Sequence, residues 1–141
     1  MGVLIDASVL IDAELGRLDL AAHVARHPDE DAFLSVVTAS ELLHGVHRAA
    51  TPAQRSRRSA FVEALLQRFP VLDVDLATAR AHARVWADLA AAGTRVGRND
   101  LWLAAAALAH GLTLATANLR EFERVPGLRV EGWGADAGAT G

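Results

Sequence analysis

Short apolar runs alternate with helical segments along this chain, and this alternation limits the possible folds more than any other feature. Residues 2–5 and 32–37 are apolar and short enough to be buried strands, and a segment with helical spacing follows each. Strands that alternate with helices form right-handed crossovers and a parallel sheet covered on both faces. The pattern therefore predicts a three-layer α/β/α domain with a mostly parallel, twisted sheet of four to five strands.

The element boundaries follow from where Gly or Pro interrupts each apolar pattern. We expect strands at 2–5, 32–37, 71–74, 112–115 and 128–131. We expect helices at 7–15, 18–27, from Thr38 to about Ala50, and at 52–69, 76–92, 99–110 and 119–124. Thr38 is the expected N-cap of its helix, with Glu41 in a capping-box position. Residues 1–133 are then one domain, and 134–141 are a small, polar tail that we expect to be disordered.

The composition excludes several classes of protein. The chain has 141 residues, of which 52% are hydrophobic, and it contains no Cys and no Lys, so all 14 basic residues are Arg. Without Lys, P-loop NTPases and Schiff-base enzymes are excluded. The formal net charge of −3 does not indicate a nucleic-acid binder, although a local arginine patch can still bind phosphate. No run resembles a signal peptide or a membrane span, so we expect a cytoplasmic protein with no membrane partner.

Acidic and polar residues follow the predicted strands at one edge of the sheet. Asp6 follows the first strand, Glu41 lies one turn into the next helix, Asp100 opens a nearly all-apolar helix, and Asn118 follows the fourth strand. Carboxylates about 4 Å apart repel by about 4 kcal/mol at an effective dielectric near 20, so such a cluster must bind protons or a cation. Oxygen ligands without Cys favour Mg²⁺ or Mn²⁺, which could activate water for phosphodiester hydrolysis.

Each of these residues also has a purely structural interpretation. Asp6 could cap the following helix, and Glu41 could complete a capping box. Asp100 gains up to about 1 kcal/mol from the helix dipole, and Asn118 could form a turn or an N-cap. The four together favour a catalytic metal site with Asp6, Glu41 and Asp100 as its ligands.

The chain resembles the PIN-domain ribonucleases, in particular the VapC-type toxins of bacterial toxin–antitoxin pairs. The resemblance covers residues 2–133. Its segments are Val-Leu-Ile-Asp-Ala-Ser-Val-Leu-Ile (3–11), Ser-Val-Val-Thr-Ala-Ser-Glu-Leu-Leu-His-Gly-Val (35–46), Gly-Arg-Asn-Asp-Leu-Trp-Leu-Ala-Ala-Ala-Ala-Leu-Ala-His-Gly (97–111) and Leu-Thr-Leu-Ala-Thr-Ala-Asn-Leu-Arg-Glu-Phe (112–122).

This resemblance implies a PIN-like fold, metal-dependent cleavage of RNA (tRNA, rRNA or mRNA), a homodimer and a VapB-type antitoxin. Asp6, Glu41 and Asp100 fall on the family's acidic positions. Ser8 and Thr116 fall on small polar positions beside them. Asn118 stands where many members carry Asp, which puts a second metal ion in doubt because a neutral amide coordinates more weakly.

Other residues have weaker patterns. Arg95 and Arg98 border the expected cleft and are candidates for RNA contact. Trp86 and Trp102 are interpreted as core or dimer interface in preference to base-stacking platforms. A helical stripe could form a groove for an antitoxin helix where it is exposed. That stripe consists of Phe61, Leu65, Leu66 and Phe69.

Two other functions remain open from the residues. A phosphatase of the haloacid-dehalogenase kind would use Asp6 as nucleophile, but its second Asp would fall at Ser8. A non-catalytic binding module would use the acidic cleft to dock a partner's arginines.

Overall fold

The computed structural model of the protein describes residues 2–134. Within that range, strands and helices alternate as predicted and form one parallel sheet. In chain order, the elements are β1 (Gly2–Ile5), α1 (Ala7–Glu14), α2 (Leu20–Ala25), β2 (Asp31–Ser35), α3 (Val36–His47), α4 (Pro52–Arg68), β3 (Val71–Leu72), α5 (Leu76–Ala91), α6 (Arg98–His110), β4 (Thr113–Thr116), α7 (Leu119–Glu123) and β5 (Val130–Gly132).

The sheet has five strands in the order β3-β2-β1-β4-β5, and every neighbouring pair is parallel. The chain therefore builds outward from β1 through β2 to β3, then returns to the other side of β1 as β4. In sheets of this kind, sites form beyond the carboxyl ends of the strands, where the winding direction reverses. That position lies here between β1 and β4.

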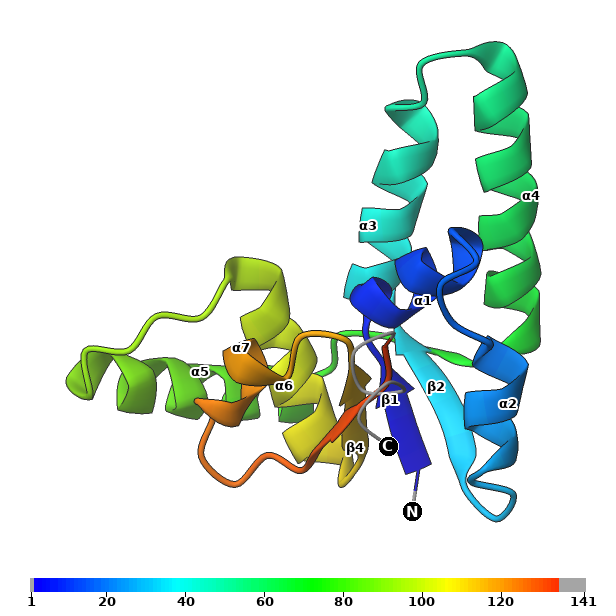
Figure 1. The fold of residues 1–141 in the computed structure, drawn as a ribbon. Helices are drawn as coiled ribbons and strands as arrows, with labels where there is room; N and C mark the ends of the chain where they lie inside the picture. The colour runs from blue at the N-terminus through cyan, green and yellow to red at the C-terminus, as the bar shows by residue number, and fades with distance from the viewer. Residues whose placement is uncertain (1, 135–141) are drawn as a thin grey trace.

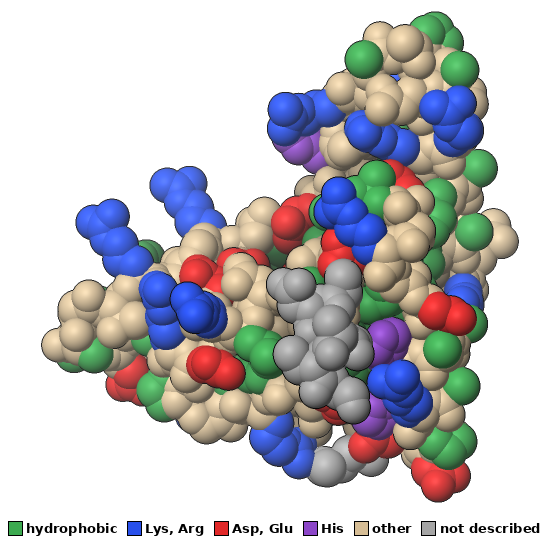
Figure 2. Space-filling view, viewed as in Figure 1, with side chains coloured by type: hydrophobic (Ala, Val, Ile, Leu, Met, Phe, Trp, Pro, Cys, Tyr) green, Lys and Arg blue, Asp and Glu red, His purple; other side chains and the backbone are tan. Residues whose placement is uncertain are grey.

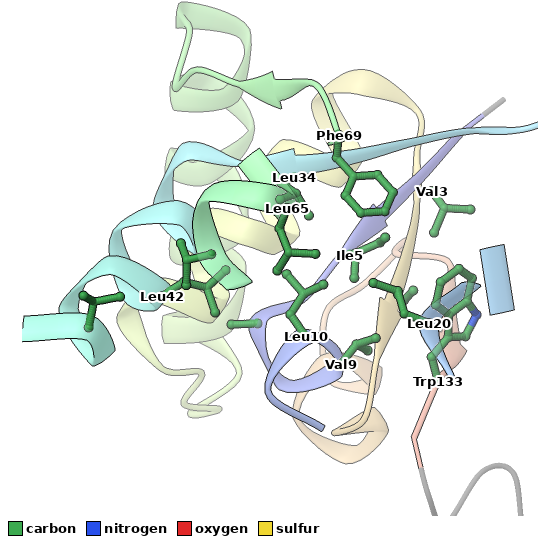
Figure 3. Close-up of a cluster of buried hydrophobic side chains, with 14 residues drawn as sticks. Val3, Ile5, Val9, Leu10, Leu20, Leu34, Leu42, Leu65, Phe69 and Trp133 are labelled. Carbon is green, nitrogen blue, oxygen red and sulfur yellow. The ribbon is translucent and has the colours of Figure 1, made fainter. Parts of the chain in front are cut away.

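Hydrophobic side chains cover both faces of the sheet. Val3 and Ile5 point into a cluster with residues of α1 to α4 (Figure 3), whereas Leu4 points into a second cluster with residues of α5, α6 and α7. This alternation follows from the two-residue period of a strand. A sheet buried on both faces requires apolar strands throughout, which explains the continuous run of hydrophobic residues in β1.

The helices extend from the sheet as two arms. Figure 1 shows α3 and α4 as an upright pair and α5 running away from the sheet on the other side, beside α6. We call these the α3–α4 arm and the α5–α6 arm. The carboxyl ends of β1 and β4 face the angle between them. Figure 2 shows acidic side chains at the base of this angle and arginine side chains on both arms.

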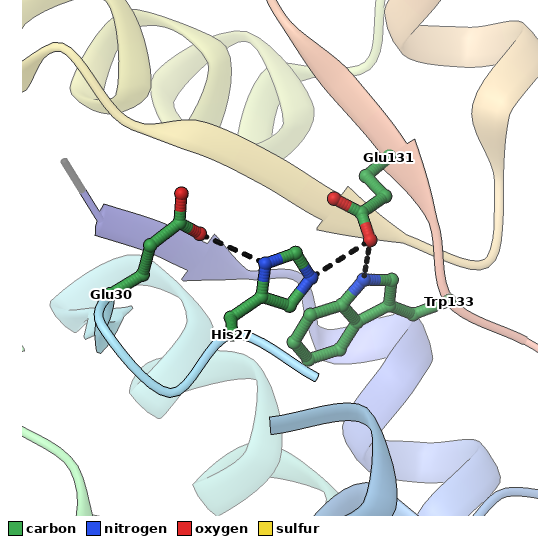
Figure 4. Close-up of polar contacts among 4 residues, drawn as sticks. All are labelled: His27, Glu30, Glu131 and Trp133. Atoms are coloured by element: carbon green, nitrogen blue, oxygen red, sulfur yellow. Dashed lines mark hydrogen bonds and ion pairs between the residues drawn. The ribbon is translucent and has the colours of Figure 1, made fainter. Parts of the chain in front are cut away.

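Polar contacts fix the last strand beside α2 (Figure 4). The two ring nitrogens of His27 each lie 3.0 Å from a carboxylate oxygen, one of Glu30 and one of Glu131. The indole nitrogen of Trp133 donates a 2.9 Å hydrogen bond to the same Glu131 oxygen. The His27 ring also stacks on Trp133, with ring centroids 5.6 Å apart. Trp133 is thereby buried against the edge of the sheet.

The start of α3 differs from the prediction. Ser35, the last residue of β2, is the N-cap, and its hydroxyl accepts a 3.1 Å hydrogen bond from the Val37 amide. The predicted capping box of Thr38 and Glu41 is therefore wrong. Thr38 is buried inside the helix, and its hydroxyl has no hydrogen-bond partner among residues 2–134. The strand ends two residues earlier than predicted because Ser35 already supplies a capping oxygen.

The third strand is also shorter than the predicted 71–74. Only Val71 and Leu72 pair with the sheet, opposite Leu34 and Ser35 of β2. No partner residue remains beyond Ser35, because the chain there has turned into α3.

The prediction of a disordered tail at 134–141 can be compared with the structure at only one residue. Of the predicted tail 134–141, only Gly134 is described, and it is buried. Residues 135–141 lie outside the described residues. None of the helices within residues 2–134 combines the length and apolar character needed to cross a membrane.

Candidate active site

Asp6 lies directly at the carboxyl end of the central strand. Its backbone amide donates a 2.9 Å hydrogen bond to Ala115 of β4, which continues the pairing of the sheet. Asp6 occupies the N-cap position of α1, but its side chain makes no capping hydrogen bond. The carboxylate instead accepts from two hydroxyls, of Ser8 at 2.7 Å and of Thr116 at 2.8 Å, both at Oδ2. The structure therefore contradicts a capping role for this side chain.

The two hydroxyls are themselves held by the backbone. The Ser8 hydroxyl accepts from the Ala117 amide at 3.0 Å, and the Thr116 hydroxyl accepts from the Asn118 amide at 2.9 Å. Each hydroxyl proton is thus free to point at Asp6. Oδ1 of Asp6 accepts no hydrogen bond from residues 2–134. One carboxylate oxygen is fixed and the other is available to a ligand.

Glu41 and Asp100 lie close enough to Asp6 for its charge to act on both. Burial raises the pKa of Glu41 to about 6, and the charges of Asp6 and Asp100 add to this effect. Burial likewise raises the pKa of Asp100 to about 6, with contributions from Asp6 and Glu121. Glu41 comes from α3 on one arm, and Asp100 comes from the first turn of α6 on the other. Three elements distant in sequence therefore concentrate negative charge at one end of the sheet.

Glu121 is an acidic residue of this cluster that sequence reasoning missed. Its carboxylate accepts a 3.0 Å hydrogen bond from the Gly97 amide, just before α6, and its charge raises the pKa of Asp100. The sequence did carry a signal, since Glu121 lies three residues after Asn118 on the short predicted helix. On an α-helix this spacing places the side chain back over the first turn.

Asn118 sits at the rim of the site. It is exposed and occupies the N-cap position of α7, yet its side chain makes no capping hydrogen bond. Its backbone amide orients the Thr116 hydroxyl, as described above. The structure thus gives its backbone a supporting part and leaves its side-chain amide open to solvent.

Arg95 and Arg98 lie to the side of the cluster. Arg98 is the first residue of α6, Arg95 belongs to the loop before it, and both are exposed. Both line a pocket with Trp86 and Trp102 on the α5–α6 arm. They lie just before and at the start of α6, two to five residues from Asp100, and their contact with RNA stays a prediction.

The donor chemistry of the cluster fits a hard divalent cation. Its donors are carboxylate oxygens. Burial and then mutual repulsion raise the pKa of Glu41 and Asp100, and a bound cation would offset both effects. Across residues 2–134, however, no group of three or more His, Asp or Glu side chains already stands close enough to hold a metal ion. The carboxylates are near neighbours that would have to close further around an ion.

Comparison with known proteins identifies the family to which the fold belongs. The PIN domain family matches residues 3–128. The chain is 41% identical over 100 residues to the tRNA(fMet)-specific endonuclease VapC of Salmonella typhimurium, covering 71% of this chain and 74% of that protein. A DNA-bound VapBC structure from Salmonella typhimurium superposes with a TM-score of 0.85 at 31% identity, over 94% of this chain and 98% of that one.

A further solved structure is described as a member of the VapBC family of toxin-antitoxin systems, VapBC-5, from Mycobacterium tuberculosis. It superposes with a TM-score of 0.74 at 38% identity, over 94% of this chain and 96% of that one. The chain belongs to the PIN-domain family and, within it, to the VapC-type ribonuclease toxins. The predicted fold and class are confirmed, and the haloacid-dehalogenase and non-catalytic alternatives are set aside.

Proposed function

We propose that this chain is a divalent-metal-dependent endoribonuclease toxin whose site is the acidic cluster at the ends of β1 and β4. The observation that carries the proposal is that three carboxylates from distant parts of the sequence, one buried and two partly buried, lie close enough for their charges to interact. Burial raises the pKa of Glu41 and of Asp100, and the charge of Asp6 raises both further. Asp6 directly follows β1, whereas Glu41 lies in α3 and Asp100 in α6. Such crowding opposes folding unless the site serves a cation.

Asp6, Glu41 and Asp100 are the proposed ligands of Mg²⁺ or Mn²⁺, with Glu121 as a further acidic neighbour. The bound ion would supply an activated water and neutralise charge on the scissile phosphate. Ser8 and Thr116 are positioning residues, because their hydroxyls hold Oδ2 of Asp6 and leave Oδ1 for the ligand. The Asn118 side-chain amide lies at the rim, where it can hydrogen-bond to RNA or to an ion-bound water.

The substrate of this chain is proposed to be tRNA. The support is the name of the Salmonella typhimurium relative, which is a tRNA(fMet)-specific endonuclease. Arginine side chains lie on both arms, and acidic side chains lie where the arms meet (Figure 2). The arginines can therefore bind RNA phosphates on either side of the site.

We further propose a VapB-type antitoxin as partner, together with a homodimer and a cytoplasmic location, where tRNA is found. An apolar groove between α1, α2 and α4 fits an antitoxin helix, and Phe61 and Leu65 of the predicted stripe line it. Leu65 and Phe69 are both buried in the core, so the stripe is only partly available.

The test is to sequence cellular RNA ends after brief expression of the wild type and of Asp6→Asn. The proposal expects new 5′ ends at a small set of tRNA positions with the wild type and none with the variant. Identical patterns from both proteins would exclude Asp6 from the chemistry. New 5′ ends confined to other RNAs would support the ribonuclease assignment but show that tRNA is not the substrate.

A further inference from the structure

An aromatic pocket lies on the α5–α6 arm, and the proposed chemistry does not use it. The pocket has a volume of about 710 Å³ and is formed by α5, the loop after it and the start of α6. Its lining includes His82, Trp86, Leu89, Arg95, Arg98 and Trp102.

Two of the aromatic side chains in the pocket stack on each other, and the third meets one of the two edge-on. The rings of His82 and Trp102 stack with centroids 3.6 Å apart and planes at 17°. Trp86 meets His82 edge-on at 5.7 Å, and it is 62% exposed. Burial lowers the pKa of His82, which favours the uncharged form of its ring. Aromatic platforms of this kind bind the faces of nucleobases.

Two arginines stand beside this surface without an acidic partner. Arg95 and Arg98 are exposed, and neither guanidinium forms an ion pair or a hydrogen bond with any group in residues 2–134. Guanidinium groups next to stacked aromatic rings match the two parts of a nucleotide, its phosphate and its base. A contact between two copies centred on this pocket would instead bring four arginines together.

The pocket and the acidic cluster share the first turn of α6. Arg98 and Trp102 are four residues apart and lie on one face of the helix, whereas Asp100, between them, points to the other side. An α-helix with its side chains is roughly 10–12 Å across. A strand of RNA that crosses the N-terminal end of α6 would therefore meet the carboxylates first and the pocket a short distance further on.

We propose that the pocket of His82, Trp86 and Trp102 binds one unpaired nucleobase of the RNA, close to the cleaved phosphate, while Arg95 and Arg98 hold an adjoining phosphate. This inference rests on the proposed function for the identity of the ligand as RNA. It also reverses the interpretation of Trp86 and Trp102 as core or dimer interface.

The first experiment measures binding without cleavage. A short, labelled single-stranded RNA is titrated in EDTA, and its fluorescence anisotropy is followed. Trp86→Ala should weaken binding by about 5- to 100-fold, the range for loss of one stacked base. Arg98→Ala should weaken it and reduce the dependence of log K on log salt by about one phosphate contact. Arg84 lies on α5, as Trp86 does, but outside the pocket. Arg84→Ala is therefore the matched control and should bind RNA as the wild type does.

The second experiment identifies which nucleobase of the RNA occupies the pocket. RNAs with a single abasic position are titrated against the wild type and Trp86→Ala. One abasic position should weaken binding to the wild type and have no further effect on the variant, because the pocket contact is already lost. Equal losses in both proteins at every position would overturn the proposal.

Sedimentation separates this proposal from a dimer contact. If Trp86→Ala dissociates a dimer while each protomer binds RNA with unchanged affinity, the pocket is an interface between copies and the proposal is wrong. The proposed function can fail independently. A wild type that binds RNA through the pocket but cleaves none with Mg²⁺ or Mn²⁺ would retain the nucleobase site and lose the nuclease assignment.

Discussion

The Thr116 hydroxyl donates a 2.8 Å hydrogen bond to Oδ2 of Asp6, and so joins the carboxyl ends of β1 and β4 across 110 residues of sequence. The bond lies where the winding of the sheet reverses, the usual position of a site in this class of fold. It fixes the orientation of the central carboxylate without using its second oxygen. The position of the proposed active site therefore follows from the pairing of two strands.

Thr116→Val should lower the rate of RNA cleavage by about 10- to 100-fold, because a residue that orients a metal ligand is lost while side-chain shape is kept. Thr116→Ser keeps the hydroxyl and should retain most of the activity. The measurement is kcat/KM on a tRNA substrate. Equal activity of the valine and serine variants would show that the hydroxyl does not position Asp6.

The metal-free protein should lose stability as the pH rises from about 4 to about 6. The pKa values of Glu41 and Asp100 are raised to about 6 in the folded protein, so the folded state binds more protons than the unfolded state in this range. Stability then falls with rising pH and stays low above it. Because both groups are only half-buried, solvent screening reduces the effect to about 1 kcal/mol each.

The measurement is thermal unfolding in EDTA, at several pH values, of the wild type and Asp100→Asn. The variant should be more stable than the wild type above about pH 6 and similar to it below about pH 4, because it lacks the charge that the site disfavours. A variant that is less stable than the wild type at every pH would contradict this origin of the raised pKa.

Glu121→Gln should reduce RNA cleavage, because Glu121 adds negative charge beside Asp100. Glu123→Gln is the matched control, since Glu123 lies on the same short helix and is exposed. Both variants are assayed for cleavage at a fixed, low Mg²⁺ concentration, where a loss of metal affinity is visible. If the two behave alike, Glu121 serves only to hold the Gly97 amide.

Trp133→Ala should lower the free energy of unfolding by about 3–5 kcal/mol, the usual cost of truncating a buried aromatic residue. Trp133 is 1% exposed and is hydrogen-bonded to Glu131. Trp86→Ala, at a side chain that is 62% exposed, should cost less than about 0.5 kcal/mol. Chemical denaturation measures both, and a large loss for Trp86→Ala would mean that this side chain is part of the core.

Most of the fold could be predicted because apolar runs and their Gly and Pro stops mark local structure. The strand at Gly2–Ile5 matches the prediction, and Gly111 ends α6 with a φ of 64°, a conformation that glycine adopts without strain. The N-cap of α3 was missed because Ser35 and Thr38 are both good capping residues. Which one caps depends on where pairing with the neighbouring strand stops, and that is set by the tertiary structure.

The acidic cluster could be predicted from the sequence because its residues lie at or near the ends of strands. In the structure, the charge of Asp6 acts on both Glu41 and Asp100. Glu121 was missed because its spacing from Asn118 places it only over the first turn of α7, whereas its contact with the Gly97 amide depends on how α7 packs against the start of α6. The metal-ligand roles of these residues stay predictions.

Calorimetric titration of Mn²⁺ into the purified protein tests the central claim most directly. At about pH 7.5, where Glu41 and Asp100 are ionised, the wild type should bind the ion. Asp6→Asn and Asp100→Asn should each lose most of that binding while remaining folded. Equal Mn²⁺ affinity in the wild type and both variants, or no binding by the wild type, would contradict a metal site shared by carboxylates at the end of β1, in α3 and in α6.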